Sequence, residues 1–118
     1  MIYKFQENRV RRAYMGGARI DAFKNKNCTQ NGRYPEEWIA STATAFNPDC
    51  IVENEGLSIC ENGSLFKDII EQNPGEILGE EQFVKYGGNL SILVKLLDST
   101  ERLVIQCHPT TQFAREHF

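Results

Sequence analysis

Two short apolar runs separated by the polar sequence DSTE constrain the fold of this chain more than any other feature. They lie in residues 90–109, which read LSILVKLLDSTERLVIQCHP. We predict two apolar strands joined by a hairpin loop at residues 98–101. Successive side chains of a strand point to opposite faces, so Gln106 and His108 should project side by side. The apolar side chains of the second run should face the other way: Leu103, Ile105 and Cys107.

Three polar side chains interrupt these apolar runs. Lys95 lies inside the first run, and Gln106 and His108 end the second. A lysine with apolar neighbours on both sides must reach the rim of the fold or lie in a cavity with polar partners. Gln106 and His108 have the arrangement of two metal ligands, but a histidine at a strand end is often a hydrogen-bonded rim residue instead. Their spacing alone leaves both interpretations open.

The size of the chain indicates one folding unit. Its 118 residues are enough for one hydrophobic core, so we expect a single unit over residues 1–118 and no second domain. Hydrophobic residues make up 41% of the chain and charged residues 25%, values that are typical of an ordered globular protein.

Charge and cysteine content exclude several kinds of partner and site. The net charge of −3 does not favour a nucleic-acid partner, and the one basic cluster, in residues 9–19, is interpreted as a solvated strand or turn. The four cysteines form no C-x-x-C pair, which argues against a zinc knuckle or a disulfide framework. The first ten residues are too charged for a signal peptide, and no apolar run approaches the ~20 residues that span a bilayer. We expect a cytoplasmic protein with reduced thiols and no membrane partner.

The rest of the chain predicts further short strands. Residues 2–5 read as an extended segment, followed by a basic strand or turn interrupted by Gly16 and Gly17, where a turn is favoured over a close approach of the backbone. Residues 25–33 are polar and predict a loop. Alternation and β-branched residues in 38–45 predict a strand that a turn at 47–49 closes.

Three helices are predicted between and after these strands. Residues 64–72 form the clearest one, with Asn62 or Ser64 as its cap, and a second short helix follows at 76–78. A final helix should begin after Pro109 with Thr110 or Thr111 as its cap. Its apolar positions include Phe113, Ala114 and Phe118.

This order of elements predicts a mainly β fold with short helices. Polar side chains inside apolar strands further suggest an open barrel that holds a ligand in its mouth.

Several motifs together resemble the amino-terminal part of class I mannose-6-phosphate isomerases, zinc enzymes of the cupin superfamily. They are YPEEWIAST, GLSICENGSLFKDIIEQNPGEILG, and LVKLLDSTERLVIQCHP followed by FAREHF. The last block is the most specific, because Lys95, Gln106 and His108 match the family's pattern together. The resemblance covers essentially all 118 residues and implies a cupin-like jelly-roll barrel that is incomplete in this chain.

The resemblance also implies roles for individual residues. Gln106 and His108 correspond to two of the family's four zinc ligands, and the other two, a glutamate and a histidine, match nothing before Phe118. Lys95 corresponds to a lysine of the substrate pocket and is our candidate catalytic residue, and Glu36 corresponds to a pocket carboxylate. Two ligands alone hold zinc poorly, so we expect the isolated 118-residue chain to lack activity.

Other positions receive structural interpretations. Trp38 should pack in the core, as large aromatics in alternating strands do. Arg11 stands where we expect the family's tryptophan, which puts an aromatic contribution to the pocket in doubt. Thr110 replaces the usual acidic residue after His-Pro and can still cap a helix. Cys107 should face away from the metal as a small core residue.

The function that the resemblance implies is a zinc-dependent interconversion of mannose 6-phosphate and fructose 6-phosphate. In this reading Lys95, Gln106 and His108 face one shared cavity, and the partner is a sugar phosphate. An alternative is a non-catalytic cupin that binds a sugar phosphate as a sensor or accessory module. A third is a folding unit with an incomplete barrel whose open strand edges allow self-association.

Overall fold

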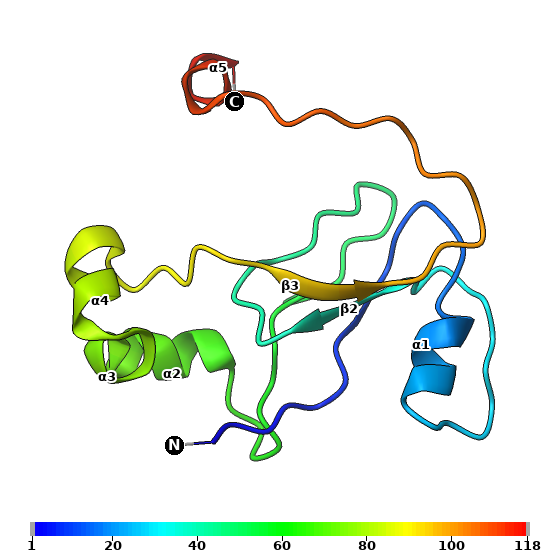
Figure 1. Ribbon diagram of the computed structural model, residues 1–118, viewed down its shortest axis with the longest axis horizontal. Helices are drawn as coiled ribbons and strands as arrows, with labels where there is room; N and C mark the ends of the chain where they lie inside the picture. The colour runs from blue at the N-terminus through cyan, green and yellow to red at the C-terminus, as the bar shows by residue number, and fades with distance from the viewer. Residues whose placement is uncertain (1, 118) are drawn as a thin grey trace.

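The computed structural model describes residues 2–117 and contains a three-stranded antiparallel sheet (Figure 1). The strands are β1 (Arg9–Val10), β2 (Glu36–Ile39) and β3 (Val94–Leu97), and they lie in the order β1-β2-β3. In the pairing of β2 with β3, Glu36 lies opposite Leu97 and Trp38 opposite Lys95. The sheet therefore joins segments that are far apart in the sequence, and this pairing positions the candidate site.

Five short helices accompany the sheet in the described residues. The bounds are α1 (Ala18–Phe23), α2 (Phe66–Gln72), α3 (Pro74–Leu78), α4 (Glu80–Tyr86) and α5 (Thr111–His117). Helix α1 lies at one end of the sheet and α2 to α4 gather at the other, as Figure 1 shows. Short helices on an open antiparallel sheet agree with the coarse fold predicted from the sequence.

A small hydrophobic core lies under helix α2. Ile70 and Phe66 are almost fully buried and pack with Cys60. The rings of Tyr3 and Phe5 contact the Phe66 ring with centroids 5.6 and 5.0 Å away. The N-terminal segment is thus held by aromatic packing, and its only strand-like pairing in the described residues is a single bridge from Phe5 to Cys60.

The three predicted helices are confirmed, with differences at their ends. α2 covers residues 66–72 of the predicted 64–72, and α3 begins two residues before the predicted 76–78. Neither Asn62 nor Ser64 caps α2, because the Asn62 side chain accepts the Ser64 N–H in a turn before the helix begins. Thr110 does cap α5, since its hydroxyl accepts the Phe113 N–H at 3.2 Å. The predicted apolar position at Phe118 lies outside the described residues.

Helix α1 was not predicted, because a residue distant in sequence holds its first turn. The buried carboxylate of Asp98 accepts the N–H groups of Gly17 at 3.0 Å and Arg19 at 2.9 Å. Gly17 has a φ of 103°, which favours glycine, and a Cβ on Gly16 would meet the Asp98 carbonyl oxygen at 1.8 Å. The glycine pair therefore serves both a turn and a close backbone approach.

The strand predicted over residues 38–45 is wrong in its bounds. β2 begins earlier, at Glu36, and ends at Ile39. Ala40 has a φ of 50°, outside the range of an extended strand, and Ser41 then bonds to Ser58 instead of continuing the ladder. The basic segment before β2 contains the short strand β1, as one of the two predicted alternatives, and residues 25–33 form the predicted loop.

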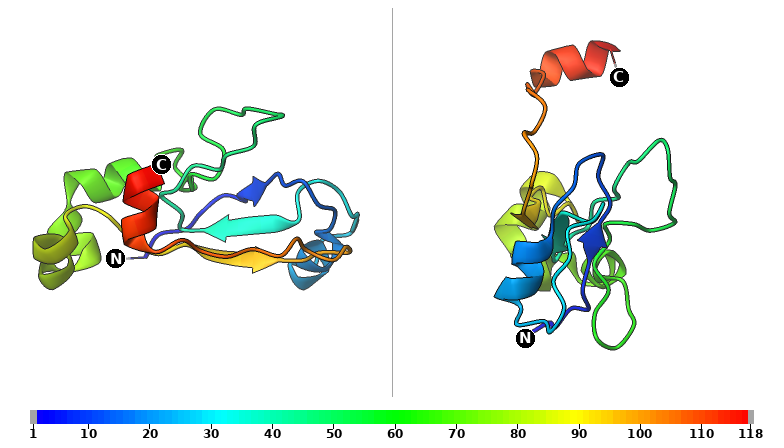
Figure 2. Two further views of the ribbon diagram at one scale, coloured as in Figure 1. Left: turned by 90° about the horizontal axis from the view of Figure 1, so that it is seen from above. Right: turned by 90° about the vertical axis from the view of Figure 1, so that its right-hand side faces the viewer.

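The hairpin predicted over residues 90–109 is also wrong. Its first strand is β3, but residues 102–109 form no strand and are exposed. The loop that follows β3 is anchored instead to Met15, whose N–H donates to Glu101 and whose carbonyl accepts the Thr100 N–H. The chain then runs away from the sheet, and α5 stands apart from the body (Figures 1 and 2). Cys107 is consequently exposed and is not the small core residue that we expected.

Candidate functional site

The buried carboxylate of Glu36 is the centre of the candidate site. Glu36 is 3% exposed although it carries an ionisable group. Glu36 and Trp38 are two residues apart on β2 and therefore share a face of the sheet, and Lys95 on β3 lies opposite Trp38. The register of two short strands thus brings Glu36 and Lys95 together.

Four donors converge on the two oxygens of this carboxylate. Oε1 accepts the Tyr14 hydroxyl at 2.5 Å and the Lys95 ammonium at 3.3 Å. Oε2 accepts Arg12 Nε at 3.2 Å and the Trp38 indole N–H at 2.7 Å. The Arg12 guanidinium also lies 4.9 Å from the Trp38 ring centroid, in cation–π contact. We call these five residues the Glu36 cluster.

The cluster keeps Glu36 ionised and Tyr14 protonated. Burial acts to raise the pKa of Glu36, but hydrogen bonds from Tyr14 and Trp38 and the charges of Arg12 and Lys95 outweigh it, so that the pKa is lowered. Burial and the hydrogen bond to Glu36 raise the pKa of Tyr14 above its ordinary value of 10.0. At neutral pH, two cations therefore face one carboxylate, which leaves an excess of positive charge.

Lys95 has an anchored ammonium on a partly exposed side chain. Its side chain is 38% exposed, whereas the carboxylate to which it donates is buried. An ammonium that is anchored on one side and open to solvent on the other can donate to an oxygen atom of a ligand. Glu36, with four donors on its two oxygens, has little capacity to take up a proton and instead orients these donors.

A cleft of about 550 Å³ opens beside the cluster. Arg12 and Tyr14 line it from the cluster side, and Gln106 lines it from the extended segment after β3. We call it the basic cleft, because Arg33 and Arg102 also line it. Its volume lies in the range of small-molecule binding sites.

The structure brings together two of the four residues predicted from the sequence. Glu36 and Lys95 form an ion pair, and Gln106 lines the adjacent cleft. His108 is exposed and is not among the residues that line this cleft. Within residues 2–117 no group of three or more histidine, cysteine or acidic side chains could hold a metal ion. The shared cavity predicted for Lys95, Gln106 and His108 therefore stays a prediction.

Arg12 and Tyr14 were not predicted as site residues. Both lie in the basic segment that we interpreted as a solvated strand or turn. Their spacing of two residues, which places side chains on one side of an extended chain, was the available signal. Arg11 points elsewhere, since it binds both oxygens of Asp49 at 2.9 Å.

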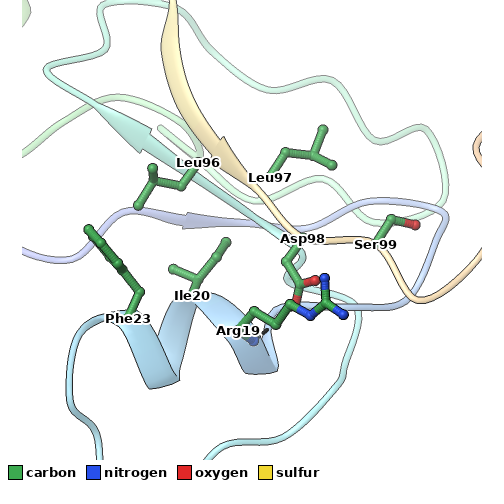
Figure 3. Close-up of a pocket in the computed structure, with 7 residues that line it drawn as sticks. All are labelled: Arg19, Ile20, Phe23, Leu96, Leu97, Asp98 and Ser99. Atoms are coloured by element: carbon green, nitrogen blue, oxygen red, sulfur yellow. Dashed lines mark hydrogen bonds between the residues drawn. The ribbon is translucent and has the colours of Figure 1, made fainter.

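A second, smaller pocket lies between α1 and β3 (Figure 3). Ile20, Phe23 and Leu96 give it apolar walls. Its acidic group, Asp98, is already committed to the first turn of α1. This pocket therefore has less chemistry to offer than the basic cleft.

A comparison with known protein families shows to which family the chain belongs. A family model described as "Phosphomannose isomerase type I, catalytic domain" matches residues 17–117. The chain belongs to the type I phosphomannose isomerase family. This confirms the resemblance read from the sequence motifs. Comparisons with curated proteins and with solved structures gave no match.

The family match covers one part of the candidate site of this phosphomannose isomerase catalytic domain and leaves out another. It includes β2, β3 and all four residues predicted from the sequence. Arg12 and Tyr14, which complete the Glu36 cluster, lie before the matched range.

None of the helices in residues 2–117 has the length and apolar character needed to cross a bilayer.

Proposed function

We propose that this phosphomannose isomerase chain takes part in the zinc-dependent interconversion of mannose 6-phosphate and fructose 6-phosphate. The observation that carries the proposal is the Lys95–Glu36 pair, anchored in a buried cluster beside a cleft of ligand size. Membership of the family supports a mannose-phosphate isomerase and a sugar phosphate substrate.

Lys95 is the proposed catalytic residue. The reaction moves a proton from C2 to C1 of the opened sugar, and negative charge develops on the oxygens at these carbons. An ammonium held near those oxygens favours the transition state over the ground state, and the loss of one such donor typically lowers kcat by a factor of about 100–1000. Glu36 positions Lys95, and the Tyr14 hydroxyl, whose proton is donated to Glu36, can accept a hydrogen bond from a sugar hydroxyl.

Gln106 and His108 are the proposed zinc ligands in this chain. An amide oxygen and an imidazole nitrogen are both donors that zinc accepts, and both side chains are exposed on an extended segment. Two donors are compatible with part of a zinc site, because zinc takes further ligands beside them. When bound, zinc would polarise the sugar oxygens and stabilise developing negative charge.

The fold and cellular setting are part of the same proposal. We infer that residues 1–118 belong to a cupin-type jelly roll, to which the open sheet β1-β2-β3 would contribute strands. The second edge of β3 is unpaired in the described residues, so additional strands or a second copy of the chain can pair there. The four cysteines are free, which agrees with a reducing cytoplasm.

One observation favours a second candidate, a non-catalytic module that binds a sugar phosphate. Within the described residues no group of three or more histidine, cysteine or acidic side chains could hold a metal ion, and binding of a sugar phosphate needs none. A binding module would use the Glu36 cluster and the basic cleft without chemistry.

The test measures zinc content and isomerisation of the protein expressed from its natural reading frame. We expect about one zinc per chain, conversion of mannose 6-phosphate, and loss of both in His108→Asn. His117→Asn is the matched control, because His117 packs on Phe113 within α5. A wild-type protein without stoichiometric zinc and without conversion refutes the isomerase and leaves the binding module.

A further inference from the structure

The basic cleft carries two arginines that the Glu36 cluster does not use. Arg33 is an exposed residue that donates one N–H to the Ala13 carbonyl. Arg102 takes part in no ion pair among residues 2–117 and is also exposed. Both guanidinium groups therefore have N–H donors available in a cleft of about 550 Å³.

The two acidic side chains of the same cleft form no ion pair with these arginines in the described residues. Asp49 binds the guanidinium of Arg11 through both oxygens. That hydrogen bonding, with a smaller contribution from the charge of Arg33, lowers the pKa of Asp49, so its carboxylate stays ionised within its pair. Glu101 accepts the backbone N–H of Met15 at 2.9 Å. Arg33 and Arg102 remain as the cations of the cleft without a carboxylate partner in the described residues.

We propose that Arg33 and Arg102 bind the phosphate group of the substrate. This inference rests on the proposed isomerase function and deepens it by assigning the phosphate subsite. A phosphate monoester carries close to two negative charges at neutral pH, and a guanidinium group offers it paired N–H donors in matching geometry. The chain itself has a net charge of −3, so attraction of such an anion requires a local cluster of this kind.

The position of the cleft fits this assignment. Arg12 and Tyr14 belong to both the cleft and the Glu36 cluster, so a ligand in the cleft contacts two of the residues that bind Glu36, although Lys95 does not line the cleft. Gln106, the proposed zinc ligand, lines the same cleft. Phe46 and Val104 give it apolar surface on which a sugar carbon chain can pack. Phosphate held by Arg33 and Arg102 would therefore place the sugar toward Arg12 and Tyr14, which bind the same carboxylate as Lys95.

The experiment measures binding of inorganic phosphate and of mannose 6-phosphate to the protein by isothermal titration calorimetry. We expect Arg33→Gln and Arg102→Gln each to weaken phosphate binding about tenfold, as the loss of a hydrogen bond to a charged group does. Arg19→Gln is the matched control, because Arg19 is an exposed arginine of the α1 pocket and should leave binding unchanged. Unfolding midpoints identify any arginine variant that fails to fold, and the other variant then carries the test.

Competition separates substrate phosphate from free phosphate. Mannose 6-phosphate should displace inorganic phosphate, while mannose, which lacks the phosphate, should not. Phosphate binding that neither arginine variant weakens overturns the assignment, and so does a failure of mannose 6-phosphate to compete. Arginine-dependent binding without any isomerisation would retain the phosphate subsite and refute only the proposed reaction.

Discussion

Replacing Glu36 by glutamine probes the buried carboxylate that holds the candidate site together. Each Glu36 oxygen accepts two donors, and glutamine keeps only one oxygen. Two of the four bonds therefore lose their acceptor and face an NH₂ group instead. A hydrogen bond to a charged group contributes about 1.5–3 kcal/mol, and the lower part of this range applies where water reaches Arg12 and Lys95.

We expect Glu36→Gln to lower the free energy of unfolding by about 3 kcal/mol. For a domain of this size that corresponds to a fall in the unfolding midpoint of roughly 10 °C. Urea titration followed by circular dichroism measures the free energy, and a thermal scan measures the midpoint.

The matched control is the neighbouring residue, Glu37. It is also buried, at 8% exposure, but only its Oε1 has a partner, Lys24 at 2.6 Å. Its Oε2 has no hydrogen-bond partner in the described residues, so an NH₂ group at that position loses no bond. Glu37→Gln should cost about 1 kcal/mol or less. Equal losses in the two variants would refute the reasoning, because burial alone would then account for both.

The pH dependence of the Glu36→Gln effect checks the same carboxylate independently. The folded-state pKa of Glu36 is lowered, so its contribution to stability is present above the ordinary value of 4.5 and is lost as the pH falls through the folded-state value. The difference in unfolding free energy between wild type and variant should be full at pH 7 and should shrink below about pH 4.5. A difference that is constant from pH 7 to pH 3 would contradict an ionised Glu36.

Three further predictions address the core, α1 and Tyr14. Ile70→Ala should lower the free energy of unfolding, measured by urea titration, by about 2–5 kcal/mol. The control Ile51→Ala, at an 87% exposed position, should lower it by less than about 1 kcal/mol. Similar losses in the two variants would argue against a core at α2. Asp98→Asn should lower the free energy of unfolding by about 1–3 kcal/mol and speed amide exchange in α1. The control Asp68→Asn, at an exposed position, should lower it by less than about 1 kcal/mol. Unchanged amide exchange in Asp98→Asn would rule out the Asp98 cap. In an absorbance titration at alkaline pH, one tyrosine should ionise above pH 10 and that late step should vanish in Tyr14→Phe; retention of the step would assign it elsewhere.

Local patterns predicted three of the five helices in the described residues, missed α4, and failed where distant residues decide the structure. Helix α2 carries its apolar face within seven residues, so its periodicity was sufficient. Helix α1 depends on Asp98, which lies 81 residues from Gly17 in the sequence. The expected hairpin failed for the same reason, because β3 pairs with β2 and the following loop is anchored to Met15. No pattern confined to residues 90–109 contains those partners.

The candidate site was predicted in part for similar physical reasons. Lys95 stood out because apolar residues surround it in sequence, and Glu36 entered only through the family resemblance. Their contact depends on the register of β2 against β3, which neither strand specifies alone. Tyr14 and Arg12 looked like ordinary surface residues, and only the fold shows that they share the carboxylate of Glu36.

The most direct test of the proposed active site follows the C2 proton of the substrate. Mannose 6-phosphate labelled with deuterium at C2 should lose its C2–deuterium NMR signal in the presence of zinc and the protein expressed from its natural reading frame. Lys95→Gln should slow that loss by a factor of about 100 or more, while Lys85→Gln, on the distant helix α4, should leave the rate unchanged. Label loss at the wild-type rate in folded Lys95→Gln, or no label loss with the wild-type protein, would contradict the assignment of Lys95 to the active site of an isomerase.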